Sequence, residues 1–178
     1  DISDNGQFIV AAASDGYIYT SSNGGNTWTA RENDAERSWT GVSCSSGGQF
    51  IAAVEYSGLI HVSVDSGSSW VTRETLLNWS DVSCSDSGRY MIAAITNGNI
   101  YYSSDYGSTW APLSNAGNRN WSCAAISGDG SRIIAAVSSG HIFTSSGDFT
   151  VWAEGTNSQS WRAVALSSNG RYMYAAVN

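Results

Sequence analysis

Hydrophobic and polar residues alternate in short runs along the whole chain, and each run ends in a polar turn. A typical stretch has one run at 79–84 and a second at 89–95, followed by a turn at Asn97-Gly98. Asn-Gly between two β-rich runs is a strong hairpin signal. A third run follows at 99–103 and a fourth begins at Thr109. Because helical periodicity is absent, the pattern predicts four short antiparallel strands.

A polar motif, S-x-D-x-G-x-T-W, joins the third and fourth strands of this unit and is called the box below. It is intact at 103–110, and altered copies occupy 21–28, 63–70 and 145–152. The Asp can cap backbone N–H groups of a tight turn, the Gly can adopt positive φ, and the Trp anchors the next strand. The last copy has lost both the Asp and the Gly at their positions but keeps its Ser and Trp. A residue set that repeats and decays in this way indicates a structural turn. The predicted structural positions are Ser21, Asn23, Gly25, Trp28, Ser63, Asp65, Gly67, Trp70, Ser103, Asp105, Gly107, Trp110, Ser145 and Trp152.

The spacing of tryptophans and glycines shows a repeat of 40–42 residues. Successive box tryptophans lie 42, 40 and 42 residues apart, and a second Trp follows each after 9 or 11 residues, at Trp39, Trp79, Trp121 and Trp161. A turn glycine comes nine residues after each second Trp, and the next box Trp lies 22 residues after that glycine. The length therefore varies only between box Trp and second Trp, which marks 29–38, 71–78, 111–120 and 153–160 as surface loops. A four-stranded unit of this period is typical of a propeller blade.

The centre of the second strand is alanine in every copy: Ala11, Ala53, Ala93, Ala135 and Ala175. A small residue at one level allows neighbouring sheets to approach closely, whereas a sheet with one wet face would show polar alternation. The pattern favours blades stacked face to face.

The box and the whole repeat resemble those of the Asp-box, or BNR, β-propellers, which include sialidases, the luminal domain of sortilin and photosystem-assembly propellers. The resemblance covers essentially all of residues 1–178 and implies an all-β fold of four-stranded propeller blades. The repeats run approximately 1–38, 39–78, 79–120 and 121–160, with a partial repeat at 161–178. In that family the boxes are structural turns at blade edges, so the resemblance indicates the fold and says little about activity.

The frame of the repeat predicts an arc. Residues 1–14 are equivalent to 165–178, so the chain begins and ends at the second strand of a blade. We expect a mature or excised segment of a larger propeller, or a subunit whose blades are completed by another copy, because an unpaired terminal strand is an aggregation-prone edge.

The charge and composition argue against several classes of partner and site. A net charge of −7 disfavours nucleic acid as a partner, and no window approaches a membrane span. Three cysteines do not suggest a disulfide framework, so we expect buried free thiols. No Cys or His pair has zinc spacing and no phosphate-binding loop is present, so no metal or cofactor is predicted. The acidic stretch 32–36 is interpreted as a solvated loop rather than a calcium site.

A sialidase-type glycosidase is the sharpest enzymatic alternative, since such a site needs three arginines converging on a carboxylate. Of the eight arginines, Arg31 and Arg73 instead share one repeat position, and Arg89 and Arg171 share another, which indicates a repeated surface. We therefore predict no catalytic residues. Asn78-Trp79-Ser80 and Asn120-Trp121-Ser122 are N-glycosylation sequons at the same repeat position. If used, Asn78 and Asn120 place the protein on the secretory route.

The sequence thus predicts a non-catalytic, extracellular binding or adhesive scaffold that recognises protein or glycan through its loops. One alternative is a structural subunit of a larger assembly or filament, with other copies of itself as partners. The other is the sialidase-like enzyme.

Overall fold

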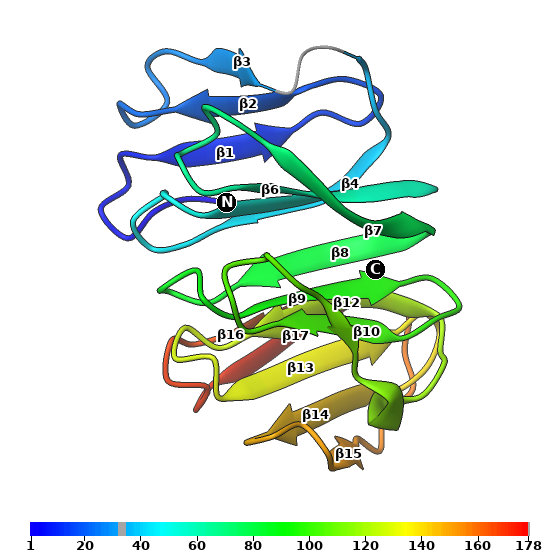
Figure 1. Cartoon of the computed structure of the whole chain (residues 1–178). Coiled ribbons are helices and arrows are strands. Elements are labelled where there is room, and N and C mark those ends of the chain that lie inside the picture. The colour runs from blue at the N-terminus through cyan, green and yellow to red at the C-terminus, as the bar shows by residue number, and fades with distance from the viewer. Residues whose placement is uncertain (32–34, 178) are drawn as a thin grey trace.

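Antiparallel sheets follow one another along the chain, and each is built from strands that are consecutive in sequence (Figure 1). The computed structural model describes residues 1–31 and 35–177, and at 74 and 75 the backbone alone. We call the sheets blades 1 to 5. Blade 1 holds β1 (Ile9–Ala12), β2 (Ile18–Ser21) and β3 (Thr29–Arg31); blade 2 holds β4 (Trp39–Cys44), β5 (Ile51–Glu55), β6 (Gly58–Ser63) and β7 (Val71–Leu77). Blade 3 holds β8 (Trp79–Cys84), β9 (Met91–Ile95), β10 (Ile100–Ser103) and β11 (Ala111–Pro112); blade 4 holds β12 (Trp121–Ile126), β13 (Arg132–Val137), β14 (Ile142–Ser146) and β15 (Trp152–Glu154); blade 5 holds β16 (Trp161–Leu166) and β17 (Met173–Val177).

The blades stack side by side around an axis. The first strand of each blade contacts the first strand of the next, in the order β4, β8, β12 and β16. These strands are the innermost ones, and the third and fourth strands lie at the outside (Figure 1). This arrangement confirms the predicted all-β fold of four-stranded propeller blades, present here as an arc. The one helix in the described chain is a 3₁₀ turn at Ser114–Ala116, and none there could cross a lipid bilayer.

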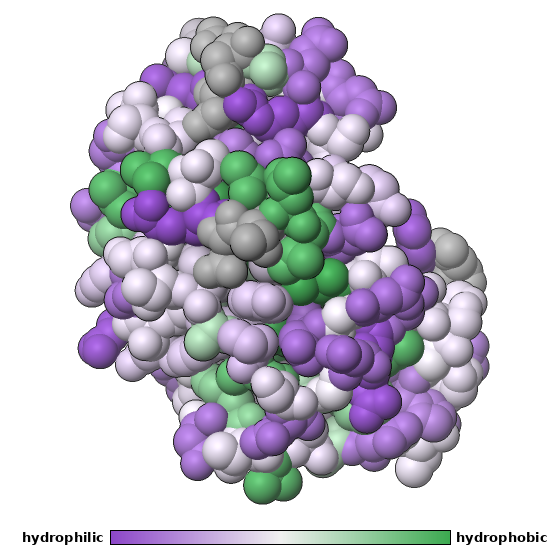
Figure 2. All heavy atoms as spheres, turned by 45° about the vertical axis from the view of Figure 1, so that its right-hand side comes forward, coloured by the Kyte–Doolittle hydropathy of each residue, from purple (hydrophilic) through white to green (hydrophobic). Residues whose placement is uncertain are grey.

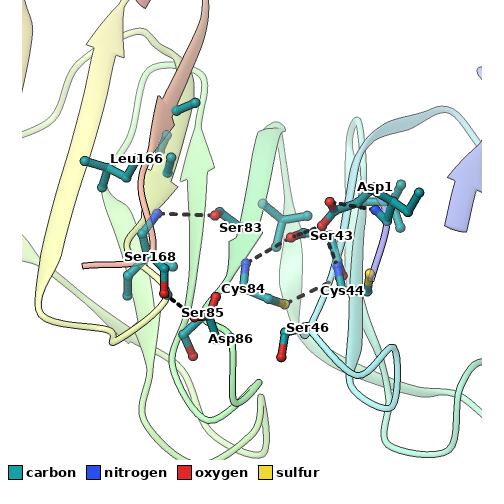
Figure 3. A pocket seen from close by; sticks show the side chains of 18 of the residues that line it. Asp1, Ser43, Cys44, Ser46, Ser83, Cys84, Ser85, Asp86, Leu166 and Ser168 are labelled. Carbon is teal, nitrogen blue, oxygen red and sulfur yellow. Dashed lines mark hydrogen bonds between the residues drawn. The ribbon is translucent and has the colours of Figure 1, made fainter. Parts of the chain in front are cut away.

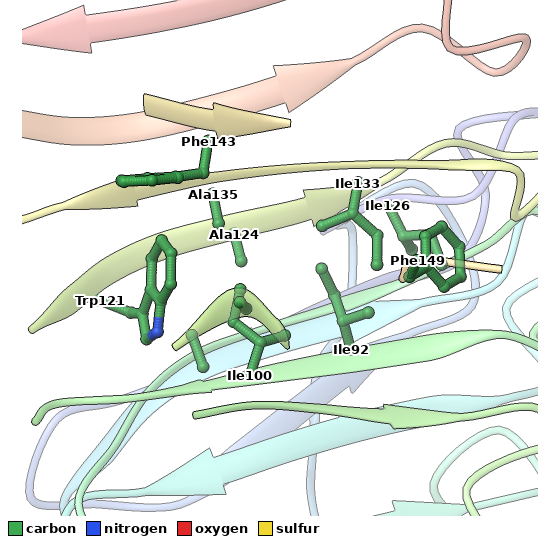
Figure 4. Close-up of a cluster of buried hydrophobic side chains, with 11 residues drawn as sticks. Ile92, Ile100, Trp121, Ala124, Ile126, Ile133, Ala135, Phe143 and Phe149 are labelled. Atoms are coloured by element: carbon green, nitrogen blue, oxygen red, sulfur yellow. The ribbon is translucent and has the colours of Figure 1, made fainter. Parts of the chain in front are cut away.

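Each hydrophobic core lies between two blades rather than inside one. Between blades 3 and 4, Ile92 and Ile100 pack against Trp121, Ile133 and the other apolar side chains of blade 4 (Figure 4). Three of the alanines predicted to allow close stacking, Ala53, Ala93 and Ala135, are fully buried at these contacts, whereas Ala11 and Ala175, in the two end blades, are exposed. The hydrophobic faces of blades 2, 3 and 4 are therefore largely covered by their neighbours, where burial and close packing stabilise them. Polar side chains make up much of the outer surface seen in Figure 2.

The second Trp of each repeat is a main component of these cores. Trp39, Trp79 and Trp121 are buried, and each packs edge-on against a ring from the third strand of its own blade: His61, Tyr101 and Phe143. The indole N–H groups of Trp39 and Trp79 reach the hairpin of the preceding blade. Trp79 Nε1, for example, donates to Gly58 O at 3.0 Å. This bond ties the first strand of blade 3 to the hairpin between the second and third strands of blade 2.

The turn glycines are required by contact with the preceding blade. Gly48, Gly88, Gly130 and Gly170 all have positive φ. A Cβ built on Gly88 would lie 2.5 Å from Phe50 Cβ, and one built on Gly130 would lie 2.1 Å from Tyr90 Cδ2. The nine-residue spacing from Trp to Gly thus places a glycine where a side chain of the preceding blade approaches the backbone most closely.

Blade 5 leaves an open surface. All five residues of β17 are exposed, whereas the equivalent strand β9 is buried throughout. Tyr174 is 66% exposed and Val177 50%. No further strand pairs with β17 in the described chain, so its outer edge is unpaired.

One predicted loop is wrong. Residues 71–78 were expected to form a surface loop, but 71–77 are β7, the longest strand, and Asn78 alone joins it to β8. The run Val71-Thr72-Arg73 has the β-branched residues that strands favour. A register shift between Gly58 and Ile60 lets Leu77 pair with Gly58, which extends the strand. Of the loop predicted at 29–38, residues 32–34 lie outside the described chain, as does most of the acidic stretch 32–36.

Candidate functional site

A large hollow lies on the axis of the arc. It has a volume of about 500 Å³ and is lined by the inner strands β4, β8, β12 and β16 with the turns that follow them. Figure 3 shows side chains from neighbouring strands and turns, among them Asp1, Ser43, Ser83 and Ser168, around the same space. We call it the axial hollow.

Side chains at one repeat position connect the inner strands. Asp1 Oδ2 accepts hydrogen bonds from Cys44 N–H and Ser43 Oγ, each at 2.9 Å. Ser43 Oγ in turn accepts from Cys84 N–H at 3.0 Å. Ser83 Oγ repeats this contact with Ile126 N–H at 3.2 Å in the next blade. Because inner strands are sheet edges, these oxygens satisfy N–H groups that would otherwise lack partners.

Backbone hydrogen bonds connect the turns at one end of the hollow. Asp4 N–H donates to Ser46 O, Ser46 N–H to Asp86 O, and Asp86 N–H to Gly128 O, at 2.9–3.0 Å. Ser168 Oγ also hydrogen-bonds the Asp86 carboxylate, so blade 5 reaches blade 3 across this end (Figure 3). The hollow therefore has a rigid rim made of backbone.

The lining is acidic. Asp1, Asp4, Asp81 and Asp86 contribute carboxyl groups, and none of the chain's eight arginines is among the lining residues. The side chain of Asp4 is exposed at the rim and makes no hydrogen bond within the described chain. The positive charge beside these carboxyl groups is the ammonium group of Asp1, which donates to Val10 O at 2.9 Å. Carboxyl groups gathered in a cavity walled by protein focus a negative electrostatic field, which favours cationic groups.

Asp81 is the most deeply placed of these acids. Its carboxylate accepts from Val82 N–H at 2.9 Å and from Ala124 N–H at 3.0 Å, which joins blade 3 to blade 4. Burial raises the pKa of Asp81 to about 6, against the lowering effect of those two N–H groups. The same burial raises the pKa of the Cys44 thiol to about 11 and of Cys84 to about 12, and all three cysteines are unpaired.

We expect stability to fall as pH rises through the pKa of Asp81. Since that pKa is raised on folding from 3.8 to about 6, the contribution of Asp81 is fully present below pH 3.8 and is lost above pH 6. The loss in the free energy of unfolding amounts to about 3 kcal/mol. Urea unfolding of the wild type and of Asp81→Asn between pH 4 and pH 7 measures it. The variant should lack this slope, and an equal slope in both proteins would contradict the assignment.

The predicted box residues lie elsewhere. They form the turns between the third and fourth strands, and none of them lines the axial hollow. In the intact box, Asp105 Oδ1 accepts from Thr109 N–H at 2.9 Å and from Ser103 Oγ at 2.8 Å, while Ser103 Oγ accepts from Gly107 N–H at 3.0 Å. Gly107 has φ +76° and accepts from the Trp110 indole N–H at 3.1 Å. The Ser, Asp, Gly and Trp thus hold one another in a closed turn.

Asp105→Ala should cost about 1 kcal/mol, the usual price of a lost turn or cap hydrogen bond. Asp4→Ala, which removes a carboxylate with no hydrogen bond in the described chain, should change stability by less than about 0.5 kcal/mol. Thermal unfolding of both variants checks this pair. A wild-type melting curve for Asp105→Ala would show that the box carboxylate is not structural.

The degraded fourth box still closes. Phe149 occupies the position of Gly107, adopts φ +58°, and accepts from the Trp152 indole N–H at 3.1 Å. Asp148, shifted by one residue, accepts from Thr150 Oγ1 at 2.7 Å. The Phe149 ring is buried edge-on against Tyr102 of blade 3. Burial of this ring offsets the strain of its left-handed backbone.

The sequons and the predicted loops lie at the end of the blades opposite the boxes. Asn78 and Asn120 are exposed, directly before β8 and β12. Asn78 Oδ1 accepts from Ser57 Oγ at 2.8 Å. Isolated bridges pair Gly16 with Arg37 and Gly98 with Arg119, so these loops lie beside the hairpins between second and third strands. The axial hollow is lined by the half of each inner strand nearer the boxes, and therefore by other residues than the loops.

Sequence reasoning did not identify the lining of the axial hollow. Its acids come from three repeat positions, and they meet only because four blades converge on one axis. Two signals were available. Asp4 and Asp86 share a repeat position, two residues before the turn glycine, and Asp1, Ser43 and Ser83 share another, at which all three carry an acceptor oxygen.

Comparisons with known proteins give the fold. No protein-family model and no curated protein matches the sequence. Among solved structures, YCF48 bound to a D1 peptide superposes with a TM-score of 0.70 and 18% identity, over 97% of this chain and 59% of that one. An ancestral GH74 enzyme superposes with a TM-score of 0.70 and 17% sequence identity, over 96% of this chain and 27% of that one. The β-propeller domain of Myceliophteria thermophila Cps50 (Swd1) superposes with a TM-score of 0.75 and 10% sequence identity, over 100% of this chain and 61% of that one.

The chain spans about 60% of the length of the YCF48 chain it matches. Identities below 20% carry the architecture and not the activity, because one fold hosts many functions. Together with the stacked four-stranded blades, these superpositions show that the chain has a β-propeller fold.

Proposed function

We propose that the protein is a non-catalytic binding scaffold whose axial hollow receives a cationic side chain of a protein partner. The observation that supports this most is the axial hollow itself, with four carboxyl groups and no arginine in its lining. A Lys or Arg side chain of a bound segment would reach these acids through the rim of turns. The YCF48 structure contains a bound peptide, which makes a peptide segment the first ligand to test here.

Several polar groups of the hollow already have structural partners, which supports binding rather than catalysis. Asp1, Ser43 and Ser83 accept hydrogen bonds from the next blade, and Asp81 accepts from Ala124 N–H. A nucleophile or general base needs a lone pair directed at substrate. The sialidase alternative has the least support, since its arginines would have to converge where the hollow is acidic.

We also propose that the protein is an Asp-box propeller. The support is the hydrogen-bond pattern of the boxes. In blade 2, Asp65 accepts from Ser63 Oγ and Ser69 N–H, and Trp70 Nε1 donates to Gly67 O, as the equivalent residues do in blade 3.

The binding proposal is tested with a panel of short peptides that differ only in net charge, measured by calorimetry at low and high salt. Lys-rich peptides should bind and acidic ones should not, and binding should weaken with salt. Asp4→Asn with Asp86→Asn should reduce affinity at least about tenfold, equivalent to 1.4 kcal/mol. Asp148→Asn removes one carboxylate that lies away from the hollow and should bind as the wild type does. Equal affinity in all variants would overturn the proposal.

A structural subunit is the second candidate, and the exposure of β17 favours it. An unpaired strand with Tyr174 and Val177 exposed can pair with a strand of another copy. Sizing over a hundredfold concentration range should show association that Tyr174→Lys abolishes. A monomer at every concentration would rule this candidate out.

We further propose an extracellular location, supported by the exposure of both sequon asparagines, Asn78 and Asn120. Native material should carry glycan at both. Mass spectrometry that finds both unmodified would remove the support.

A further inference from the structure

A second, smaller cleft lies between the outer strands of blade 1 and the box turn of blade 2. Its volume is about 190 Å³, and its lining includes Phe8, Thr20, Thr27, Arg31, Ser66 and Ser68. We call it the Arg31 cleft. The box turn of blade 2 contacts it directly, since a Cβ on Gly67 would lie 3.2 Å from Thr20 Cγ2 and 3.5 Å from Arg31 Cγ.

Arg31 is held in place by a buried hydroxyl group. Its Nε donates to Thr20 Oγ1 at 3.0 Å, and Thr20 is only 4% exposed. The two terminal amino groups of the Arg31 guanidinium have no hydrogen-bond partner within the described chain. A guanidinium oriented through Nε can offer both amino groups to one oxyanion, the bidentate geometry that favours carboxylate and sulfate.

Hydroxyl groups supply further donors beside Arg31. The side chains of Thr29, Ser66 and Ser68 line the cleft without hydrogen bonds to other described residues. Among the residues that the structure describes, no Asp or Glu lines the cleft. In a chain of net charge −7, a described lining of one cation and several hydroxyls favours an anionic ligand.

The altered first box accounts for one of these donors. Where blades 2 and 3 have Asp65 and Asp105, blade 1 has Asn23. Asp65 Oδ2 accepts the proton of Ser69 Oγ at 2.6 Å. Asn23 instead donates through Nδ2 to Thr27 Oγ1 at 2.9 Å, an orientation fixed because Asn23 Oδ1 accepts Thr27 N–H. The hydroxyl proton of Thr27 is therefore free to donate into the cleft, and one negative charge is absent beside it.

The equivalent position in blade 2 lacks this arrangement. Arg73 is equivalent to Arg31, but Val62 replaces Thr20, so Arg73 has no hydroxyl to orient its Nε. Blades 3 and 4 have Leu113 and Gly155 at the arginine position. Within the repeat, the combination of Arg, Thr and Asn is found in blade 1 alone.

We propose that the Arg31 cleft binds the carboxylate or sulfate group of an acidic saccharide. The cleft is smaller than the 300–1,000 Å³ typical of pockets that enclose a whole ligand, so it fits the charged group of a sugar. Ser and Thr hydroxyls suit the sugar's own hydroxyls, and Phe8 offers an apolar ring at the edge. The inference extends the binding role proposed above, and it does not depend on the axial hollow.

The test is an NMR titration, observing Arg31 Nε–H and backbone amides, with four probes. These are a sulfated disaccharide, an unsulfated disaccharide with a uronic acid, a neutral disaccharide and inorganic sulfate. One or both acidic disaccharides should bind and shift Arg31, and which one binds identifies the anionic group. The neutral disaccharide should not bind, and sulfate alone should bind at least about tenfold more weakly than the better disaccharide. Sulfate binding as tightly as the disaccharides, or no response to either acidic one, would overturn the proposal.

Three variants locate the site. Arg31→Gln should abolish measurable binding, while Arg73→Gln, its matched control in blade 2, should leave the affinity unchanged. Asn23→Asp restores the residue of the intact boxes, so it should fold at least as well as the wild type yet bind about tenfold more weakly. Unchanged affinity in Arg31→Gln, or equal losses in Arg31→Gln and Arg73→Gln, would contradict the site. Asp4→Asn tests the axial hollow and should not affect saccharide binding, so the two proposals fail independently.

Discussion

Gly88→Ala is expected to destabilise the protein by about 3–4 kcal/mol. Gly88 has φ +72°, a backbone conformation that costs a residue with a Cβ about 1–2 kcal/mol. The new methyl group would also lie 2.5 Å from Phe50 Cβ in the preceding blade. Relieving that overlap requires the blades to move apart, at a further cost of about 1–3 kcal/mol. Urea unfolding, with the midpoint and slope fitted separately, measures the loss.

Gly147→Ala is the matched control for this result. Gly147 has nearly the same backbone conformation, with φ +74°, but a Cβ there meets no atom within 4 Å. The control should therefore lose only the backbone term, about 1–2 kcal/mol. If both variants lost the same amount, the close approach of Phe50 would play no part in selecting glycine.

Trp79→Ala is expected to cost about 4 kcal/mol, within the range for removing a large core aromatic. The Trp79 side chain is 0% exposed, packs edge-on against Tyr101, and lies in the core between blades 2 and 3. The substitution would leave a cavity at that contact and remove the donor to Gly58 O. Loss of a partner for that carbonyl adds to the cost of the cavity.

Trp28→Ala serves as the comparison, because it removes the same side chain from a box. Trp28 is 45% exposed and donates to Gly25 O at 3.1 Å within its own turn. Its loss should cost about 1 kcal/mol. Thermal unfolding followed by near-ultraviolet circular dichroism compares the two. A cost for Trp28→Ala as large as that for Trp79→Ala would mean that the exposed box turn of blade 1 is covered in solution.

The residues that stabilise the blades are different from the residues that we propose for binding. Gly88, Trp79 and Asp105, for example, line neither the axial hollow nor the Arg31 cleft. Substitutions in the clefts, Asp4→Asn or Arg31→Gln, are therefore expected to change binding with little effect on folding. Separate stability and binding measurements on each variant distinguish these two groups.

The sequence by itself determined the blade. Turn chemistry is local, so Asp105, Gly107 and Asn97-Gly98 predict their hairpins without knowledge of the rest of the chain. Repetition then separates the invariant part, with its Trp and Gly spacing, from the variable connections. The one misread connection, 71–78, shows the limit: whether a polar–apolar run forms a strand depends on an available edge, here that of β6.

Only the tertiary structure decided where the clefts lie and which side chains share them. Asp4, Asp81 and Asp86 come together because separate blades converge on one axis, a relation that no local spacing encodes. Burial is decided in the same way: Trp28 and Trp110 occupy the same box position, yet one is exposed and the other buried by its neighbours. In the sequence, Asn23 in place of the Asp of the intact box indicates only that the motif has decayed. In the structure it reverses a hydrogen bond beside Arg31, because the effect of one side chain depends on the charges and donors that folding places around it.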